Sequence, residues 1–270
     1  MNQIILKKIS QNMNKISLSL IAGLASSFLL AQPTHAATLG QNLIINGDAE
    51  QGLGDSIGNA VGADIPLIPG WTTTGNFSVL EYGATGFEFT NGLGNVVRVN
   101  LPDVNVPGPD DRGKNLFFGG ASRASSSASQ SIDVNSIASV IDAGKAVFDL
   151  SGWLGGYDDD DDIATLNITF LGQTNQSLGI ANISAPNAAE RNNVTGLFLR
   201  GTNGFVPAGT RQINVVLNAN HTGGRVNDSY ADNLSLVITQ VPEPTISGLS
   251  LLIASGLMTR KLRRSRRQFN

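Results

Sequence analysis

The stretch Ala164-Thr165-Leu166-Asn167-Ile168-Thr169-Phe170 alternates strictly between apolar and polar side chains. In an extended chain, successive side chains point to opposite faces, so the apolar residues share one face and the polar residues share the other. The stretch therefore predicts a β-strand with one buried face and one face in water, which is typical of antiparallel sheets.

Similar runs occur on both sides of this stretch. The segments 213–219 and 234–238 repeat the alternation, and further strands are predicted at 42–46, 77–82, 96–101, 115–118, 128–134 and 146–154. Clusters of Gly, Asn, Asp and Pro separate them, and one helical turn is expected over 136–142, ended by Gly144. About ten short strands divided by turn-forming clusters predict an all-β, antiparallel jelly-roll sandwich.

The N-terminal segment has the order of a secretory signal peptide. Three lysines within the first fifteen residues precede an apolar run over 16–30, and Pro33-Thr34-His35-Ala36 supplies a small-x-small cleavage site. We therefore predict an N-terminal signal helix over 1–36 that is cleaved after Ala36. The alternative is a retained N-terminal anchor.

The C-terminal segment has three parts: Val241-Pro242-Glu243-Pro244, an apolar run over 246–258, and an Arg-rich end over 260–267. The apolar run is shorter than the roughly twenty residues of a free-standing membrane span. The dense cations that follow it are typical of a stop on the cytoplasmic side of a membrane. A short hydrophobic helix packed on the domain is the alternative.

This tail resembles the PEP-CTERM sorting signal of bacterial surface proteins, with Pro242, Glu243 and Pro244 as the motif. The resemblance implies recognition by an exosortase-type membrane protease, transient anchoring in the membrane, and delivery to the cell surface or the exopolysaccharide matrix. The expected layout is a signal peptide over 1–36, a β-sandwich body over 37–240 and a sorting segment over 241–270.

The composition of the body excludes several classes of function. Of the 18 Lys and Arg residues and 21 Asp and Glu residues, the body keeps nine cations and twenty acids, a net charge near −11. Nucleic-acid binding requires a cationic face, so it is not expected. The chain has no cysteine, which excludes thiol catalysis, and the body has one histidine, His221, which argues against a zinc enzyme.

Two motifs stand at the two ends of the body. They are Asn42-Leu43-Ile44-Ile45-Asn46-Gly47-Asp48-Ala49-Glu50 and Tyr230-Ala231-Asp232-Asn233-Leu234-Ser235-Leu236. The pair resembles the galactose-binding-domain-like jelly rolls, which include many carbohydrate-binding modules. This resemblance implies a polysaccharide as the ligand.

The same resemblance implies a structural calcium ion that joins the first and last strands. Glu50 and Asp232 would supply carboxylate oxygens, and backbone carbonyls near Asp48 and Asp232 would supply more. Calcium prefers six to eight oxygen ligands, so the residue types are suitable. The alternative is that these carboxylates accept hydrogen bonds from turn amides.

The run of five aspartates from Asp158 to Asp162 is interpreted as a solvated loop, with a weak calcium site as the alternative. Beside it, Tyr157 is the aromatic candidate for stacking on a sugar. Arg225, Asn227 and Asp228, in the loop before the last strand, are candidates for polar contacts. Trp71 and Trp153 are expected in the core, and His221 is expected to be an exposed loop residue.

No pair of carboxylates is marked as catalytic by spacing, and there is no Gly-x-Ser-x-Gly elbow. We therefore predict an exported, non-catalytic binding module for extracellular polysaccharide. A structural surface protein without a glycan site is the first alternative, and a glycoside hydrolase with an unrecognised carboxylate pair is the second.

Overall fold

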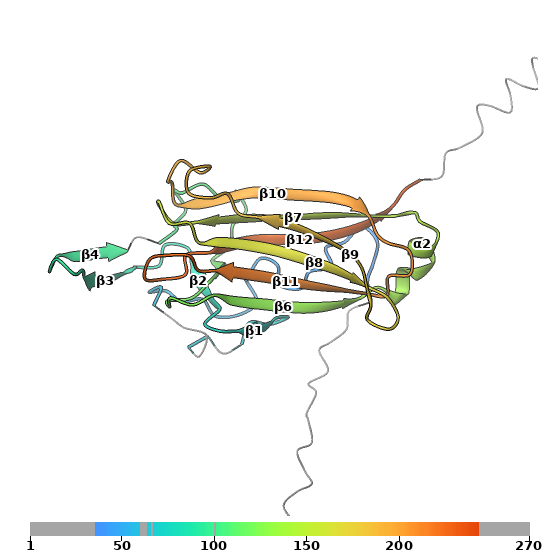
Figure 1. Ribbon diagram of the computed structural model, residues 1–270, viewed down its shortest axis with the longest axis horizontal. Helices are drawn as coiled ribbons and strands as arrows, with labels where there is room; N and C mark the ends of the chain where they lie inside the picture. Colours follow the sequence, from blue (N-terminus) through green and yellow to red (C-terminus); the bar gives the residue numbers. More distant parts are fainter. Residues whose placement is uncertain (1–35, 60–63, 66, 100, 243–270) are drawn as a thin grey trace, which may run out of the picture. The chain divides into compact units, whose positions relative to one another are not determined.

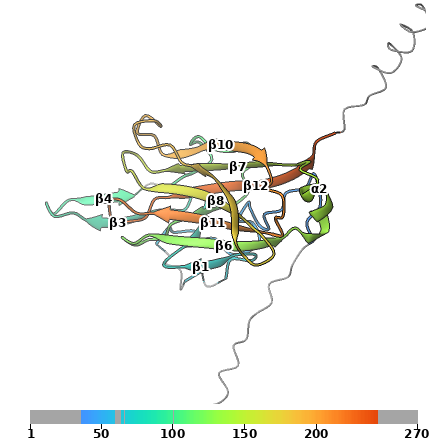
Figure 2. The ribbon, with the colours of Figure 1, turned by 45° about the vertical axis from the view of Figure 1, so that its right-hand side comes forward.

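The computed structural model describes residues 36–242, apart from 60–63, 66 and 100. Two five-stranded antiparallel sheets stack face to face, as Figure 1 and Figure 2 show. The predicted all-β jelly-roll sandwich is confirmed. The predicted helices at the two termini lie outside the described residues.

The first sheet has the strand order β1-β6-β11-β8-β9. Its strands are β1 (Thr72–Thr74), β6 (Ser126–Asp133), β11 (Gln212–Asn220), β8 (Ile163–Leu171) and β9 (Ser177–Ser184). The strand β8 contains the alternating stretch that predicted the fold, and it lies between β11 and β9 in antiparallel register.

The second sheet has the strand order β10-β7-β12-β5-β2. Its strands are β10 (Gly196–Phe205), β7 (Ala146–Gly156), β12 (Tyr230–Gln240), β5 (Asn115–Phe118) and β2 (Ser78–Glu81). A separate hairpin of β3 (Phe87–Thr90) and β4 (Val96–Val99) extends from one end of the sandwich (Figure 1). The short helices η1 (Asn135–Ile137) and α2 (Ala138–Asp142) match the predicted helical turn, and Gly144 follows them in the left-handed conformation.

The core lies between the two sheets and follows from strand alternation. In β8, Leu166, Ile168 and Phe170 are at most 2% exposed, as the sequence pattern predicts. Phe148 of β7 packs on Phe170 with ring centroids 5.2 Å apart, so the two sheets meet through aromatic and aliphatic side chains. Trp71 is also buried, which confirms its predicted place in the core.

The predicted first strand at 42–46 was wrong. The segment contributes one isolated bridge, Asn42 with Val237, and otherwise forms turns in which Asn46 has a positive φ of 51°. Asn and Asp favour such turns because their short polar side chains bond to the local backbone. Here the Asn42 side chain accepts hydrogen bonds from the amides of Ile44 and Leu236, at 3.0 Å each.

Four strands were missed by the sequence analysis: β1, β3, β9 and β10. In β10, Leu199 is 60% exposed and Phe205 is 67% exposed, so its apolar residues do not mark one buried face. The edge strand β9 has only one buried residue, Ile183, and its Ile180 is 73% exposed. An alternating pattern predicts a strand only where one face is buried and the other faces water. In these edge strands the two faces differ too little in apolar character.

Within the part of the chain that the structure describes, no helix has the length and apolar character needed to cross a membrane. The predicted signal peptide, Glu243, Pro244 and the apolar tail lie outside the described residues. At the two ends of the described chain, Ala36 and Pro242 are both exposed. The expected cleavage, sorting and domain boundaries stay predictions.

Candidate functional site

The outer face of the β10-β7-β12 sheet carries an apolar pair, Leu199 and Trp153, that is partly open to solvent. Leu199 of β10 pairs in register with Trp153 of β7, and Trp153 pairs with Asp232 of β12. Leu199 is 60% exposed and Trp153 is only partly buried. The ring and the aliphatic side chain therefore lie side by side on the outside of the sandwich, on neighbouring strands.

The turn-rich N-terminal segment forms a wall beside this pair. The amide of Leu234 donates to the carbonyl oxygen of Gly47 at 2.8 Å, which fixes the Asn46-Gly47 corner against β12. A Cβ at position 47 would overlap the Leu234 carbonyl oxygen, so only glycine fits there. The Asn46 side chain bonds to the backbone of Pro69 and Gln51, at 2.9 Å each.

An irregularity in β12 completes the opposite end of the site. The register with β7 shifts between Asp232 and Ser235, and Asn233 has a positive φ of 47°. This bulge turns the Asn233 side chain outward, where its amide donates to Asp111 at 2.9 Å. Bulges commonly re-aim side chains in this way at functional surfaces.

Together these elements enclose a groove of about 460 Å³. The apolar part of its lining includes Trp153 and Leu199. The polar part consists of small hydroxyls, amides and carboxylates: Asn42, Asn46, Asp48, Gln51, Asp111, Ser151, Asn233 and Ser235. An aromatic floor between hydrogen-bonding walls suits a ligand that has both apolar faces and hydroxyl groups.

Trp153 was expected in the core, and it is partly buried against a small core cluster, with the remaining part of its side chain lining the groove. In β7, Phe148, Leu150 and Leu154 are buried on the inner face, whereas Ser151 and Trp153 lie on the outer face. The alternation of this strand was available in the sequence, and it places position 153 opposite to 154. The partial exposure of the side chain was missed because large aromatic residues in strands are usually buried.

The two terminal motifs come together beside the groove, as their resemblance to galactose-binding-like jelly rolls implies. Asp232 is fully buried and accepts hydrogen bonds from the Tyr82 hydroxyl and the Asn233 amide, at 2.7 Å each. Glu50 accepts from the Asn115 amide at 2.7 Å. Asp48 is exposed and accepts from the Glu50 amide at 3.3 Å.

Burial, together with the charges of Glu50 and Asp48, raises the pKa of Asp232 to about 7. The hydrogen bond from Tyr82 opposes this rise. A carboxylate in such surroundings favours either a proton or a nearby cation. The carboxyl groups of Asp48, Glu50 and Asp232 do not each bring an oxygen within 4.8 Å of the others. The calcium ion expected from Glu50, Asp232 and nearby backbone carbonyls stays a prediction.

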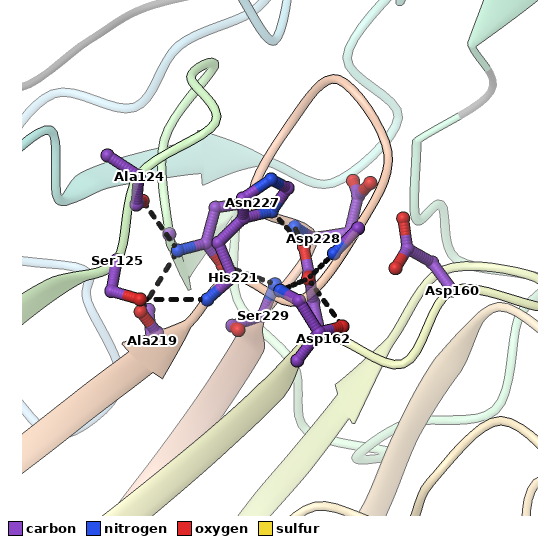
Figure 3. A network of polar contacts seen from close by, with 12 residues as sticks. Ala124, Ser125, Asp160, Asp162, Ala219, His221, Asn227, Asp228 and Ser229 are labelled. Atoms are coloured by element: carbon purple, nitrogen blue, oxygen red, sulfur yellow. Dashed lines mark hydrogen bonds and ion pairs between the residues drawn. The ribbon is translucent and has the colours of Figure 1, made fainter.

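A second group of carboxylates lies at the loop end of the sandwich, where Asp160, Asp162 and Asp228 converge (Figure 3). One oxygen from each of the three lies within 4.8 Å of the others. Asp162 is buried and accepts from the amides of Thr222, at 2.6 Å, and Asp228, at 2.8 Å. Nδ1 of His221 lies 3.2 Å from Oδ2 of Asp162.

Asp228 is held apart from solvent. It is 5% exposed, and it accepts a hydrogen bond from the buried Tyr230 hydroxyl at 2.7 Å. Burial, together with the charges of Asp162 and Asp160, raises its pKa to about 7. Burial is also the main cause that raises the pKa of Asp160. Hydrogen bonds from backbone amides and from the Tyr230 hydroxyl thus stabilise this group from within the protein.

The aspartate run is the predicted solvated loop only in part: Asp158, Asp159 and Asp161 are exposed, Asp160 is half-buried and Asp162 is buried. Its backbone wraps around Arg191, which is 2% exposed. The guanidinium donates to the carbonyl oxygens of four residues: Tyr157, Asp158, Asp160 and Val194. A buried guanidinium requires acceptors for its donors, and carbonyl oxygens of the loop supply them.

The predicted ligand residues occupy different surroundings. The carbonyl of Tyr157 contacts Arg191, and its ring packs beside a small core cluster. Arg225 is exposed, with its guanidinium over the Phe89 ring at 4.2 Å from the centroid. Asp228 and Asn227 are buried, and none of the predicted ligand residues lines the groove. His221, expected to be exposed, is only 12% exposed because it packs against Asp162.

No protein-family model matches the chain, and no curated protein sequence matches it. Among solved structures, the chain is similar to the enzymatically active domain of bacteriophage CBA120 tailspike protein 4, with 15% identity and a TM-score of 0.41. That match covers 74% of this chain and 21% of the tailspike chain, so this chain spans about a fifth of that protein.

Two further matches are to carbohydrate-binding modules. A family 16 carbohydrate-binding module is 16% identical with a TM-score of 0.37, over 73% of this chain and 99% of that one. The CBM22-1 xylan-binding domain from Paenibacillus barcinonensis is 12% identical with a TM-score of 0.38, over 77% and 100%. At these identities the likeness concerns the fold alone.

Proposed function

We propose that the β-sandwich is a non-catalytic polysaccharide-binding module whose ligand lies in the groove over β10, β7 and β12. The observation that carries the proposal is the pairing of the exposed Leu199 with the partly buried Trp153 in the lining of that groove. Sugar rings have apolar C–H faces that stack on aromatic rings, and hydroxyl groups that bond to polar side chains.

The walls of the groove supply polar side chains that can form hydrogen bonds with sugar hydroxyl groups. Ser151 and Ser235 lie on the strand surface beside Trp153, and Gln51 lies in the N-terminal corner. Hydroxyl and amide groups both donate and accept, which matches the dual character of sugar hydroxyls. A groove that is open to solvent suits a segment within a long chain, because the chain can continue beyond the site at both ends.

The test is binding of a panel of soluble oligosaccharides by isothermal titration calorimetry, with Trp153→Ala as the decisive variant. We expect at least a tenfold loss of affinity, since stacking on a Trp ring and its buried area contribute about 1–3 kcal/mol. Val216→Ala, on the outer face of β11 in the other sheet, is the matched control and retains affinity.

Tyr157→Ala discriminates the groove from the loop site that the sequence favoured. Loss of binding in Tyr157→Ala with full binding in Trp153→Ala moves the ligand site to the acidic loop. Unchanged binding in both variants shows that neither Trp153 nor Tyr157 contacts the ligand. If the wild-type protein binds none of the oligosaccharides, the result favours a structural surface protein without a glycan site.

A glycoside hydrolase is the second candidate, because Asp48 and Asp111 both line the groove. Glycoside hydrolysis uses two carboxyl groups that flank the scissile bond. The measurement is the release of reducing ends from every oligosaccharide that binds. Release that disappears in Asp48→Asn or Asp111→Asn overturns the non-catalytic assignment.

We further propose that the protein is exported and sorted to the cell surface or extracellular matrix. Support comes from the chain ends: Ala37 is the first buried residue after the expected cleavage at Ala36, and Pro242 is exposed. Mass spectrometry of the protein from its native cell tests this. We expect an N-terminus at Ala37 and loss of the basic tail through an exosortase-type protease near Pro242, Glu243 and Pro244.

A further inference from the structure

The groove carries negative charge that no lining cation offsets. Asp48 and Asp111 are exposed and lie on its walls. Among the described residues that line the groove, none is Lys or Arg. A ligand in this groove therefore meets carboxylates without meeting a guanidinium or an ammonium group.

The cation nearest in sequence to Asp111 is turned away from the groove. Arg112 donates to the carbonyl oxygens of three residues of its own loop: Asp103, Val106 and Pro109. Its guanidinium also lies over the Tyr82 ring, 5.4 Å from the centroid. These contacts hold the positive charge inside the loop rather than beside Asp111.

The cation next to Leu199 in the sequence is also directed elsewhere. Arg200 follows it in β10, so strand alternation places the Arg200 side chain on the opposite face. Its register partner is Gly152, which is buried and faces Leu234 and Ile183 in the interior. The Nε atom of Arg200 is itself buried.

Further carboxylates extend the negative region beyond the groove. Asp149 is exposed on the outer face of β7, two residues before Ser151. Glu50 is exposed in the same N-terminal corner as Asp48. Clustered charge of one sign attracts opposite charge and repels like charge at the approach to a site.

We infer that the groove selects its glycan by charge. It binds chains that bear free amino groups, such as de-N-acetylated hexosamines, in preference to their N-acetylated counterparts, and it excludes chains that bear uronate or sulfate groups. The inference rests on the proposed function, because it concerns the ligand class of the same groove. The preference arises from the negative charges of Asp48 and Asp111 on the groove walls. The positive charges of Arg112 and Arg200 are held away from the groove and do not offset them.

The experiment compares three oligosaccharide classes of equal length: chitosan oligomers, chitin oligomers and oligouronates. Affinities are measured in EDTA, so that no divalent cation offsets the carboxylates. The pH is mildly acidic, where sugar amines are protonated, but above the ordinary range of an aspartate pKa. We expect chitosan oligomers to bind about two- to fivefold more tightly than chitin oligomers for each carboxylate engaged.

Variants assign the preference to the groove. Asp48→Asn and Asp111→Asn each reduce the preference for chitosan, and the double variant removes it. Asp111→Asn keeps an oxygen that accepts from Asn233, so the bulge is preserved. The control is Asp159→Asn, which removes one exposed carboxylate from the acidic loop and leaves the preference unchanged. Added salt weakens the preference in the wild type.

The outcomes separate the charge preference from glycan binding itself. Equal binding of chitosan and chitin oligomers, or tight binding of oligouronates, overturns the charge inference and leaves the proposed function standing. A preference that survives in the double variant also overturns it. Absence of binding by every oligosaccharide, in the wild type and at low salt, overturns the proposed function itself.

Discussion

Two groups of three carboxylates differ in how the fold treats them. The groove group is Asp48, Glu50 and Asp232, and the loop group is Asp160, Asp162 and Asp228. In the groove group, two members are exposed and each bonds to a different part of the chain. In the loop group, oxygens of all three lie within 4.8 Å of one another, and two of the members are buried.

The difference lies in burial and in the groups that each set of carboxylates contacts. The loop group is compact because backbone amides and the Tyr230 hydroxyl surround it, so it ties loops to one another. In the groove group Asp48 and Glu50 are exposed and Asp232 is fully buried, and only Asp48 lines the groove beside the partly buried Trp153. The loop group therefore has a structural role, and Asp48 is the member of the groove group that can face a ligand.

The largest expected effect is on stability, from Asp162→Ala. This change removes the acceptor of the Thr222 and Asp228 amides and the partner of His221, and leaves buried donors without a partner. We expect a loss of about 3 kcal/mol or more in the free energy of unfolding, measured by urea denaturation. Glu50→Ala is the control from the groove group, and a comparable loss there contradicts the contrast.

Calcium provides the next largest contrast. If the groove group holds the predicted ion, saturating calcium stabilises the protein by about 2.7 kcal/mol at a hundredfold excess over Kd. Thermal unfolding with calcium and with chelator measures this shift. We expect Asp232→Asn to abolish it and Asp228→Asn to preserve it.

The reverse pattern, with calcium stabilisation lost only in Asp228→Asn, places the ion in the loop group. Absence of any calcium response in the wild type removes the calcium prediction. Asp48, Glu50 and Asp232 then act only as acceptors for turn amides and for Tyr82.

A smaller effect is expected from pH. The raised pKa of Asp228, about 7, means that the folded protein binds more protons than the unfolded chain between the ordinary aspartate pKa and about pH 7. Stability then falls as pH rises through this range. The loss is of order 2 kcal/mol, because a pKa difference of one between the folded and unfolded states corresponds to about 1.36 kcal/mol, and relaxation of the protein partly relieves the effect of burial.

Asp228→Asn tests this dependence, since an amide oxygen still accepts from Tyr230 and carries no charge. We expect urea denaturation in EDTA to give a flatter pH profile for the variant than for the wild type. Parallel profiles contradict the burial of an ionisable group at this position.

The smallest effect on stability is expected from Asp48→Ala. The carboxylate is exposed and accepts one bond, from the Glu50 amide at 3.3 Å. We expect a change within about 0.5 kcal/mol in the free energy of unfolding. A loss above that range shows that Asp48 supports the fold rather than a ligand.

Much of the fold was predictable because alternation records which face of a strand is buried. The strands β8, β11 and β12 follow directly from it, and β5 was predicted with the bounds that the structure has. The edge strands β9 and β10 were missed because their apolar residues are partly exposed. The segment 42–46 was predicted as a strand but forms turns. The Asn42 side chain bonds to the local backbone and to β12, and the segment does not form a full strand ladder.

The candidate site was predictable only in part. The two terminal motifs were expected to meet, and they do so through Gly47 and Leu234. The ligand residues expected in the loops, Tyr157, Arg225 and Asp228, lie apart from the groove. Alternation separates Trp153 from Leu154 but does not show how far distant segments cover each face of β7, so the partial exposure of Trp153 could not be predicted.

Local patterns of residues were enough to predict the sandwich, the acidic character of the body and the absence of thiol chemistry. These properties follow from alternation and composition, which depend on neighbouring residues alone. Long-range packing, in contrast, buries Arg191 within an aspartate loop, encloses Asp228, and joins Trp153 and Leu199 in one floor. The energy of burial or charge at each of these positions is set by what a distant segment of the chain brings to it.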